Sequence, residues 1–298
     1  MKLSLLTPEW DKSQYELLDS GNLMKLERFG AHVVLRPEPQ ALWQSSMSMK
    51  QWESLTDAVF VKNRGSEDKG QWELTPQMKE QWWIEYQSPD QPSLKFRLRM
   101  GLTSFKHIGV FPEQASNWEF IHSRVAELVD RGGSQPEVLN MFAYTGGATL
   151  AATTAGAKVT HVDSVKQTVS WSRENMEGSD LEGVRWVVED ALKFARREVR
   201  RGRKYQGIIL DPPSYGRGAD GEKWVLTDNI LEMLKECREL LTSDGFLVLN
   251  LYSMGLSALL GRTLVESVFG KRESLEQGEL YVEDQAHKSL PLGVFIRF

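Results

Sequence analysis

Apolar and polar side chains alternate in short runs along residues 1–104, and this period-two pattern predicts half-buried β-strands. Turn residues separate the first runs, at Asp19-Ser20-Gly21-Asn22 and at Gly30. Strands are expected at residues 15–18, 23–26, 32–35, 58–62, 71–74, 82–86 and 94–100. The pattern predicts a small β-rich N-terminal domain over residues 1–104, for which we expect a part in substrate recognition.

From about residue 115 the period changes, and strand-like runs alternate with runs that have the spacing of helices. Ser116-Asn117-Trp118-Glu119 has the form of a capping box, which predicts that a helix begins there. Strands are then expected at residues 138–142, 158–163, 184–189, 207–210, 246–251, 279–283 and 294–298, with helices up to 155 and at 164–177, 190–200 and 227–241. The alternation predicts an α/β domain over residues 105–298, with a doubly wound parallel sheet and an antiparallel C-terminal hairpin.

Composition places the chain among globular proteins, with 41% hydrophobic and 26% charged residues. The single cysteine, Cys237, excludes a disulfide framework and a cysteine-based zinc cluster, and it fits a reducing compartment. No apolar run reaches the ~18 residues of a membrane helix, and Pro8 and Glu9 interrupt the N-terminus too early for a signal peptide. The five histidines lack the spacing of metal ligands. We therefore expect a cytoplasmic protein with no metal and no membrane partner.

The formal net charge of -5, from 36 Lys+Arg against 41 Asp+Glu, argues against a protein held on nucleic acid mainly by bulk charge. Two local basic features remain: Lys95, Arg97 and Arg99 on one face of a predicted strand, and six cations from Arg196 to Lys204. A solvated face is favoured for both, with an RNA contact as the alternative. Six of the ten tryptophans precede residue 84, where core packing is favoured over base stacking.

Three strand ends of the α/β domain carry residues that suit a nucleoside, because ligands of open sheets bind at the carboxyl ends of strands. The small residues at 143–147 would let a ligand approach the amides of a helix N-terminus, although the spacing is neither that of a dinucleotide site nor that of a P-loop. Asp163, after the second strand, could accept both hydroxyls of a ribose. Asp190, after the third, could accept an adenine amino group. A structural turn and helix N-caps are the alternatives.

The fourth strand ends in Asp211-Pro212-Pro213-Ser214-Tyr215, the sharpest motif in the chain. Two prolines fix the backbone and remove two amide donors, so this turn is expected to be rigid and to offer bare carbonyl oxygens. A carboxylate, prolyl carbonyls and an aromatic ring can together accept hydrogen bonds from an amine and stack on a planar ring. A plain strand-exit turn is the alternative.

In their order along the chain, these motifs resemble those of the class I S-adenosylmethionine-dependent methyltransferases, and within them the bacterial 23S rRNA (cytosine-C5) large-subunit methyltransferase family. The resembling stretches are VLNMFAYTGGATLAA (138–152), VTHVDSV (159–165), VVEDALKF (187–194), IILDPPSYGRG (208–218) and FKHIGVFPEQASNW (105–118). The resemblance implies a Rossmann-like, seven-stranded methyltransferase sheet, S-adenosylmethionine as the cofactor and ribosomal RNA as the partner.

The resemblance also implies two sets of site residues. The cofactor-binding set is Phe111, Gln114, Phe142, Ala143, Tyr144, Thr145, Gly146, Asp163, Ser164, Asp190 and Ala191. Within this set, residues 144–146 would line the methionine moiety, Asp163 the ribose and residues 190–191 the adenine, while Phe111 and Gln114 would form a lid. The catalytic set, facing the methyl group and the target base, is Asp211, Pro212, Pro213 and Tyr215.

Two features depart from that family. We expect no PUA domain, for which the sequence leaves no room, and no cysteine follows the fifth strand, where the chain reads Asn250-Leu251-Tyr252-Ser253-Met254. Methylation of pyrimidine C5 needs a nucleophile at C6, and Cys237 falls on the apolar stripe of a predicted helix. The sequence therefore predicts methyl transfer to a nucleobase in ribosomal RNA, at a nitrogen rather than at C5. A protein or small-molecule acceptor and a non-catalytic binding module are the alternatives.

Overall fold

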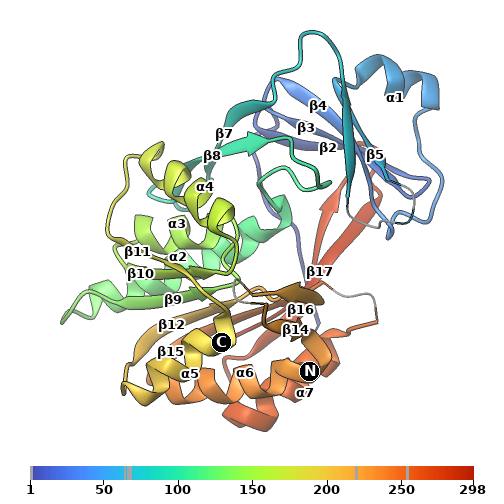
Figure 1. Cartoon of the computed structure of the whole chain (residues 1–298). Helices are drawn as coiled ribbons and strands as arrows, with labels where there is room; N and C mark the ends of the chain where they lie inside the picture. Colours follow the sequence, from blue (N-terminus) through green and yellow to red (C-terminus); the bar gives the residue numbers. More distant parts are fainter. Residues whose placement is uncertain (1–2, 64, 66–68, 219–220, 253–254) are drawn as a thin grey trace. The chain divides into compact units, whose positions relative to one another are not determined.

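The computed structural model describes residues 3–63, 65, 69–218, 221–252 and 255–298. The chain forms two compact units (Figure 1). The α/β unit comprises Met1–Leu6, Gln114–Leu280 and Gly293–Phe298, and the β unit comprises Thr7–Glu113 and Tyr281–Leu292. These limits differ from the predicted boundary at residue 104, because each unit includes a segment from the opposite end of the chain.

An eight-stranded sheet forms the centre of the α/β unit, in the order β1-β16-β17-β15-β12-β9-β10-β11. Its strands are β1 (Ser4–Leu6), β9 (Glu137–Met141), β10 (Lys158–Asp163), β11 (Val184–Val188), β12 (Tyr205–Leu210), β15 (Leu241–Leu251), β16 (Glu276–Glu283) and β17 (Ser289–Arg297). Neighbouring strands from β15 to β11 are parallel, whereas β17 pairs with β15 antiparallel. The predicted seven strands and C-terminal hairpin are confirmed, and β1 adds an edge strand parallel to β16.

Helices cover both faces of this sheet, as expected of a doubly wound fold (Figure 1). They are α2 (Ala115–Asp130), α3 (Gly147–Thr154), α4 (Lys166–Glu177), α5 (Ala191–Arg200), α6 (Leu226–Leu240) and α7 (Ala258–Phe269). Successive strand residues point to opposite sides: Leu139 joins the core under α5, α6 and α7, while Val138 joins the core under α2 and α3. None of the helices in the described part of the chain combines the length and the apolar content that crossing a bilayer requires.

Two helices of this unit differ from the prediction: α2 begins earlier than expected, and α7 was not expected. The capping box expected at Ser116 is wrong: α2 begins at Ala115, directly after a 3-10 turn over Pro112–Gln114, so Ser116 already lies inside the helix. The sequence pattern also gave no indication of α7, whose N-cap is Ser257. Gly261 interrupts the apolar pattern of α7, and a Cβ there would lie 2.2 Å from the Ile296 side chain. The close approach of α7 to β17 therefore requires a residue that weakens the helical signal.

The β unit contains a five-stranded sheet in the order β2-β3-β4-β5-β6 and a separate hairpin of β7 and β8. Its elements are β2 (Tyr15–Gly21), β3 (Met24–Phe29), β4 (His32–Pro37), α1 (Met49–Leu55), β5 (Ala58–Lys62), β6 (Gly70–Leu74), β7 (Gln81–Gln87) and β8 (Lys95–Gly101). The β-rich prediction is confirmed. Trp52 and Trp82 lie in the core as expected, whereas Trp83 is 37% exposed and the Arg97 guanidinium lies 5.2 Å from its ring.

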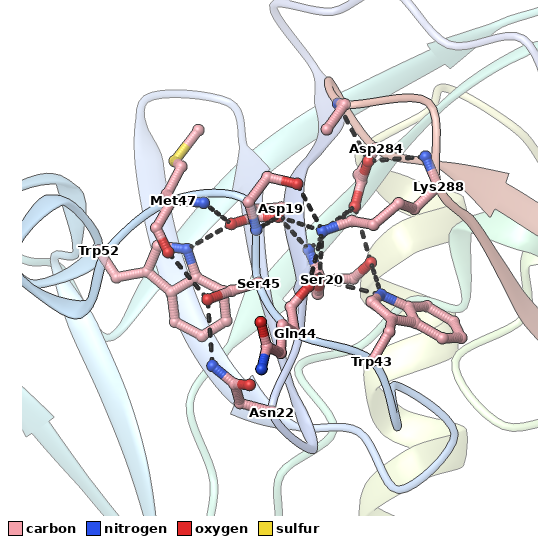
Figure 2. A network of polar contacts seen from close by, with 12 residues as sticks. Asp19, Ser20, Asn22, Trp43, Gln44, Ser45, Met47, Trp52, Asp284 and Lys288 are labelled. Atoms are coloured by element: carbon pink, nitrogen blue, oxygen red, sulfur yellow. Dashed lines mark hydrogen bonds and ion pairs between the residues drawn. The ribbon is translucent and has the colours of Figure 1, made fainter.

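A buried polar network joins the turn of the C-terminal hairpin to the rest of the β unit (Figure 2). Lys288 Nζ lies 2.9 Å from Asp19 Oδ1 and donates to the carbonyl of Ser20 at 2.7 Å. Asp284 Oδ2 accepts hydrogen bonds from the backbone N and the hydroxyl of Ser20, at 3.1 and 2.8 Å. These contacts explain why Tyr281–Leu292 belongs to the β unit, since they link residues more than 260 positions apart in sequence.

Candidate active site

The carboxyl ends of β9, β10, β11 and β12 lie at one edge of the sheet, because these strands are parallel and adjacent. The loop after β9 has an unusual backbone: Phe142 and Tyr144 adopt φ values of 57° and 49°, in the left-handed region. Such conformations cost non-glycine residues on the order of 1–3 kcal/mol each and are concentrated at functional sites. The loop is thus held in a shape that the surrounding contacts must maintain.

The two glycines of this loop are required by packing. Gly146 has a φ of 90°, and a Cβ there would lie 2.0 Å from the Ser172 hydroxyl on α4. At Gly147 a Cβ would lie 2.5 Å from the ring of Trp118 on α2. These glycines therefore have a packing role, since they let α3 approach its two neighbouring helices, and the assignment of Gly146 to the cofactor stays a prediction.

Asp163, at the end of β10, connects two of the strand-end loops. Its Oδ2 accepts a hydrogen bond from Tyr144 N and its Oδ1 accepts one from Val165 N, both at 2.9 Å. Burial raises the pKa of Asp163, and these two backbone hydrogen bonds oppose that rise. Each oxygen keeps a second lone pair. The carboxylate can therefore shape the loop and still accept two hydroxyl groups, which fits the diol of a ribose.

The other predicted cofactor residues of the α/β unit follow β9, β10 or β11, except Gln114, which ends the 3-10 turn before α2. Asp190 is the N-cap of α5, as the alternative reading expected, because its Oδ1 accepts a hydrogen bond from Lys193 N at 2.9 Å. Its other carboxylate oxygen can still accept a hydrogen bond from a ligand. Ala143, Thr145 and Ala191 are buried. Phe111 belongs to the β unit, where its ring lies 5.1 Å from that of His107. Its assignment to the cofactor stays a prediction.

Asp211 has a raised pKa and a carboxylate oxygen without a hydrogen-bond partner among the described residues. Tyr252 Oη donates to Asp211 Oδ2 at 3.4 Å, whereas Oδ1 is buried and has no hydrogen-bond partner among the described residues. Burial raises the pKa of Asp211 to about 7, and the hydrogen bond from Tyr252 acts in the opposite direction. A buried carboxylate oxygen without a partner is costly to keep, so it marks a candidate site for a ligand donor.

Two carbonyl groups of the turn after Asp211 accept hydrogen bonds, although the sequence predicts bare carbonyls there. Trp224 Nε1 donates to the carbonyl of Pro213 at 2.7 Å, and the carbonyl of Ser214 accepts from Leu226 N at 3.0 Å. The expectation of two bare prolyl carbonyls is therefore wrong for Pro213, because the chain folds back over it. Among the described residues, the carbonyl of Pro212 has no such partner.

A short hairpin of β13 (Tyr215–Arg217) and β14 (Lys223–Val225) forms the loop that follows. Trp224 is buried and its ring lies 4.7 Å from that of Phe142, so it anchors this hairpin to the loop after β9. Tyr215 is 52% exposed and can present its ring to a ligand. The sequence at 216–224 is glycine-rich and predicts a loop beside the site, for which substrate binding and a passive role are equally open. The structure makes this segment partly structural, while residues 219–220 and the Ser253 position lie outside the described residues.

Other candidates from the sequence have structural roles. Cys237 is fully buried on α6, as expected, and burial raises the pKa of its thiol well above the ordinary range. Four arginines of the basic run are paired with carboxylates, as in Arg197–Glu189 at 2.6 Å and Arg201–Glu198 at 3.1 Å. In the described part of the chain, no three His, Cys, Asp or Glu side chains gather in a way that could hold a metal ion.

The family follows from comparison with known proteins. A sequence model described as S-adenosylmethionine-dependent methyltransferase matches residues 91–269, more than half of the chain. The chain belongs to this family. A methyltransferase of *Agrobacterium tumefaciens*, solved as an S-adenosylmethionine-dependent enzyme, is 35% identical, with a TM-score of 0.86 over 99% of this chain and 93% of that one. The cofactor of the family, S-adenosylmethionine, is thus the cofactor of this chain.

Other relatives of this methyltransferase are more distant. A putative methyltransferase complexed with SAH has a TM-score of 0.70 at 19% identity, over 95% of this chain and 75% of that one, and supports the fold alone. The "Ribosomal RNA large subunit methyltransferase K/L" of *Shewanella frigidimarina* is 28% identical over 158 residues, which are 52% of this chain. The matched region spans only 21% of that relative's length.

Sequence reasoning missed Tyr252 as a residue of the candidate site, and it named Trp224 only as part of the loop at 216–224, without its contact to Pro213. Tyr252 directly follows β15, in the stretch where a cysteine was sought, and the rule that ligands bind at strand ends could have drawn attention to it. Asn250, the one polar residue in the apolar run 246–251, was a second signal, and the structure shows it 2% exposed and hydrogen-bonded to Gln114. For Trp224 the sequence contains no comparable signal, because its partner is a backbone carbonyl.

Proposed function

We propose that this methyltransferase moves the methyl group of S-adenosylmethionine to a nitrogen of a nucleobase in RNA, with ribosomal RNA as the substrate. The observation that supports this most strongly is Asp211, whose buried Oδ1 has no partner among the described residues and whose neighbour Pro212 offers a carbonyl oxygen. An amino group with two hydrogens is complementary to this pair of acceptors. The name of the *Shewanella* relatives supports the choice of RNA.

Residues at the ends of β9, β10 and β11 would hold the cofactor. Asp163 accepts the ribose hydroxyls, the loop of Tyr144, Thr145 and Gly146 lines the methionine moiety, and Asp190 with Ala191 faces the adenine. When bound, S-adenosylmethionine supplies a methyl group on a sulfonium that is already activated. The chain's own task is therefore to align the acceptor with that methyl group and to exclude water.

Asp211 and Pro212 would orient the acceptor amine. Its two N–H groups donate to Asp211 Oδ1 and to the Pro212 carbonyl, so the nitrogen lone pair faces the methyl carbon. As the N–C bond forms and the C–S bond breaks, the nitrogen loses one proton, which Asp211 can accept. A pKa of about 7 suits a group that exchanges protons near neutral pH. The exposed ring of Tyr215 stacks on the base.

For Asp163→Ala we expect affinity for S-adenosylmethionine to fall by roughly 2 kcal/mol, or about 30-fold in Kd, the scale of two charge-assisted hydrogen bonds. The substitution also releases Tyr144 N and Val165 N, so the loop after β9 loses its anchor. Isothermal titration calorimetry on the folded variant measures the change. Asp130→Ala, at an exposed carboxylate at the end of α2, is the matched control. Unchanged affinity in the Asp163 variant would remove this residue from the cofactor site.

For Cys237→Ser we expect turnover to be retained, with a packing loss on the order of 1 kcal/mol in the free energy of unfolding. Transfer to C5 of cytosine would need a thiolate at C6, and Cys237 is the single cysteine of the chain. Its burial and raised pKa make it unsuitable. Steady-state methyl transfer and urea denaturation measure the two quantities. A folded but inactive variant, or a covalent adduct with RNA that contains 5-fluorocytosine, would contradict this account.

The acceptor class can be tested with S-adenosylmethionine that carries a labelled methyl group. Purified enzyme is incubated with RNA, protein and small-molecule fractions from a strain that lacks the gene, so that target sites are unmodified. We expect label in RNA, and none with heat-inactivated enzyme. The net charge of -5 is the observation that favours the second candidate, a protein acceptor. Label in the protein fraction alone would support that candidate instead.

A further inference from the structure

A chain of hydrogen bonds inside the α/β unit ends at Asp211. It begins at Arg297 on β17, whose Nη1 donates to Asn117 Oδ1 at 3.2 Å. Asn117 Nδ2 donates to Gln114 Oε1 at 3.0 Å, and Gln114 Nε2 donates to Tyr252 Oη. Tyr252 Oη in turn donates to Asp211 Oδ2 at 3.4 Å. We call this series, from Arg297 through Asn117, Gln114 and Tyr252, the relay.

The direction of the relay is fixed by its first member. A guanidinium has only donors, so the atom of Asn117 that faces Arg297 must be its carbonyl oxygen, and its NH₂ group points away. Asn250 supports the same direction of donation, because its Nδ2 also donates to Gln114 Oε1, at 3.0 Å. With two donors on its oxygen, Gln114 turns its NH₂ group toward Tyr252.

The orientation of Gln114 in turn sets the hydrogen bond to Asp211. The Tyr252 oxygen accepts a hydrogen bond from Gln114, and the Tyr252 hydroxyl donates to Asp211 Oδ2. Donation to Oδ2 distinguishes the two carboxylate oxygens. Oδ1 is the atom without a partner among the described residues, and the relay leaves it for a donor on the acceptor.

Burial restricts the side chains of the relay to one set of orientations. Asn117, Asn250, Gln114 and Arg297 are exposed by 1%, 2%, 6% and 8%, and they come from α2, β15, the turn before α2 and β17. Buried polar groups cost free energy unless they are hydrogen-bonded, so each member holds its neighbours in one orientation. Rotation of Tyr252 away from Asp211 would break the hydrogen bonds that its hydroxyl makes with Gln114 and Asp211.

We propose that Tyr252 is a positioning residue for methyl transfer, aimed by the relay at Asp211 Oδ2 so that Oδ1 is presented, ionised, to the acceptor amine. The proposal rests on the proposed function and deepens it. It also revises the expectation for Gln114: the amide assigned to the cofactor lid uses its oxygen and one N–H within the relay. Tyr252 lies in the stretch where the resembling C5 enzymes carry their cysteine, so a hydrogen-bond donor stands where a nucleophile would be needed.

In the described part of the chain, the side chain hydrogen-bonded to Asp211 is that of Tyr252, after β15. The carbonyl of Met141 on β9 accepts a hydrogen bond from Asp211 N at 3.4 Å. On β17, Arg297 acts through the relay and is paired with Glu276 at 2.8 Å. Loss of the Tyr252 hydroxyl should therefore act on Asp211 mainly through the lost hydrogen bond, which opposes the effect of burial on the pKa of this carboxyl.

The first test is the variant Tyr252→Phe, assayed for methyl transfer across pH. We expect kcat at pH 7 to fall about tenfold, and the acid limb of the rate profile to move up by about one pH unit. Affinity for S-adenosylmethionine stays unchanged. The matched control is Tyr205→Phe, which removes a buried hydroxyl that donates to a carboxylate, Glu198, at the opposite end of β12. The control should leave the acid limb in place.

The second test needs no acceptor. The Asp211 carboxyl is titrated by carbon-13 NMR in the protein without RNA, with its resonance assigned from Asp211→Asn. We expect Tyr252→Phe to raise the titration midpoint by about one pH unit and Tyr205→Phe to leave it unchanged. Gln114→Glu provides a second route, because the new carboxylate accepts the phenolic proton and turns it away from Asp211. This variant should raise the midpoint as well.

The outcomes separate the relay from the proposed function. An enzyme that methylates no RNA but shows these shifts would refute the proposed acceptor and leave the link between Tyr252 and Asp211 standing. An Asp211 titration that is the same in the wild type, Tyr252→Phe and Gln114→Glu would overturn the relay, whatever the acceptor. A rate lost at every pH with no movement of the acid limb would also overturn it, since a purely structural role predicts that result.

Discussion

Replacing Asp211 with alanine is expected to lower the rate of methyl transfer by about 10³-fold, within the range typical of a positioned acid–base group. Affinity for S-adenosylmethionine should change by less than about twofold, because Asp211 faces the acceptor and Asp163 binds the cofactor. Single-turnover transfer and calorimetry measure the two quantities. Equal losses of rate and of cofactor affinity would show that the turn after β12 is mainly a wall of the cofactor site.

The pH dependence of Asp211 gives this prediction a second part. Burial raises the pKa of Asp211 to about 7, so the ionised acceptor is present above neutral pH. The wild-type rate should fall about tenfold per pH unit below pH 7 and level off above it. A carboxyl with a raised pKa adds stability when protonated, and that stability is lost as pH rises from about 4 to about 7. Asp211→Asn should therefore be more stable than the wild type at pH 8, but not at pH 4.

Replacing Asp19 with alanine is expected to destabilise the β unit by about 3–5 kcal/mol, the scale of breaking a buried ion pair. Asp19 is 1% exposed and accepts from Met47 N at 2.8 Å, from Trp52 Nε1 at 2.9 Å and from Lys288 Nζ at 2.9 Å (Figure 2). Alanine would remove the acceptor of the fully buried Trp52 indole, and it would also remove one acceptor of Met47 N and one of Lys288 Nζ. Urea denaturation followed by tryptophan fluorescence measures the loss.

The control for Asp19 is an exposed pair in the C-terminal hairpin that also carries its partner Lys288. His287 is paired with Glu283 at 2.7 Å, but the side chains are 84% and 45% exposed, so His287→Ala should cost less than about 0.5 kcal/mol. Burial alone would raise the pKa of Asp19, yet hydrogen bonds from Lys288, Met47, Ser46 and Trp52 bring it below the ordinary value. The stabilisation is thus present above about pH 4 and lost as pH falls further. A variant with wild-type stability at pH 7 would contradict this role.

Periodicity located β9, β10, β11, β12 and β15, because each of these five strands contains a short run of mainly apolar residues. It also located Asp163, Asp190 and Asp211, since each directly follows such a run. The short strand β1 and the β-unit hairpin at 281–292 were outside its reach. Their places depend on pairing with β16 and on the Asp19–Lys288 contact, which join opposite ends of the chain.

The candidate site was predicted less completely for a related reason. A motif identifies residues that are adjacent in sequence, and Asp211-Pro212-Pro213 was found in that way. The relay joins Arg297, Asn117 and Tyr252 from three distant segments, and no local pattern connects them. Trp224 likewise covers the Pro213 carbonyl only because β13 and β14 fold into a hairpin. Hydrogen-bond partners of this kind become visible only with the fold.

The central claim, methylation of a nucleobase nitrogen in RNA, is tested most directly by nucleoside mass spectrometry of ribosomal RNA. Three strains are compared: one with the wild-type gene, one without it, and one with Asp211→Asn in its place. The account predicts an N-methylated nucleoside that is present in the first strain and absent from the other two, with 5-methylcytidine equal in all three. Loss of 5-methylcytidine in the strain without the gene, or RNA methylation identical in the three strains, would contradict it.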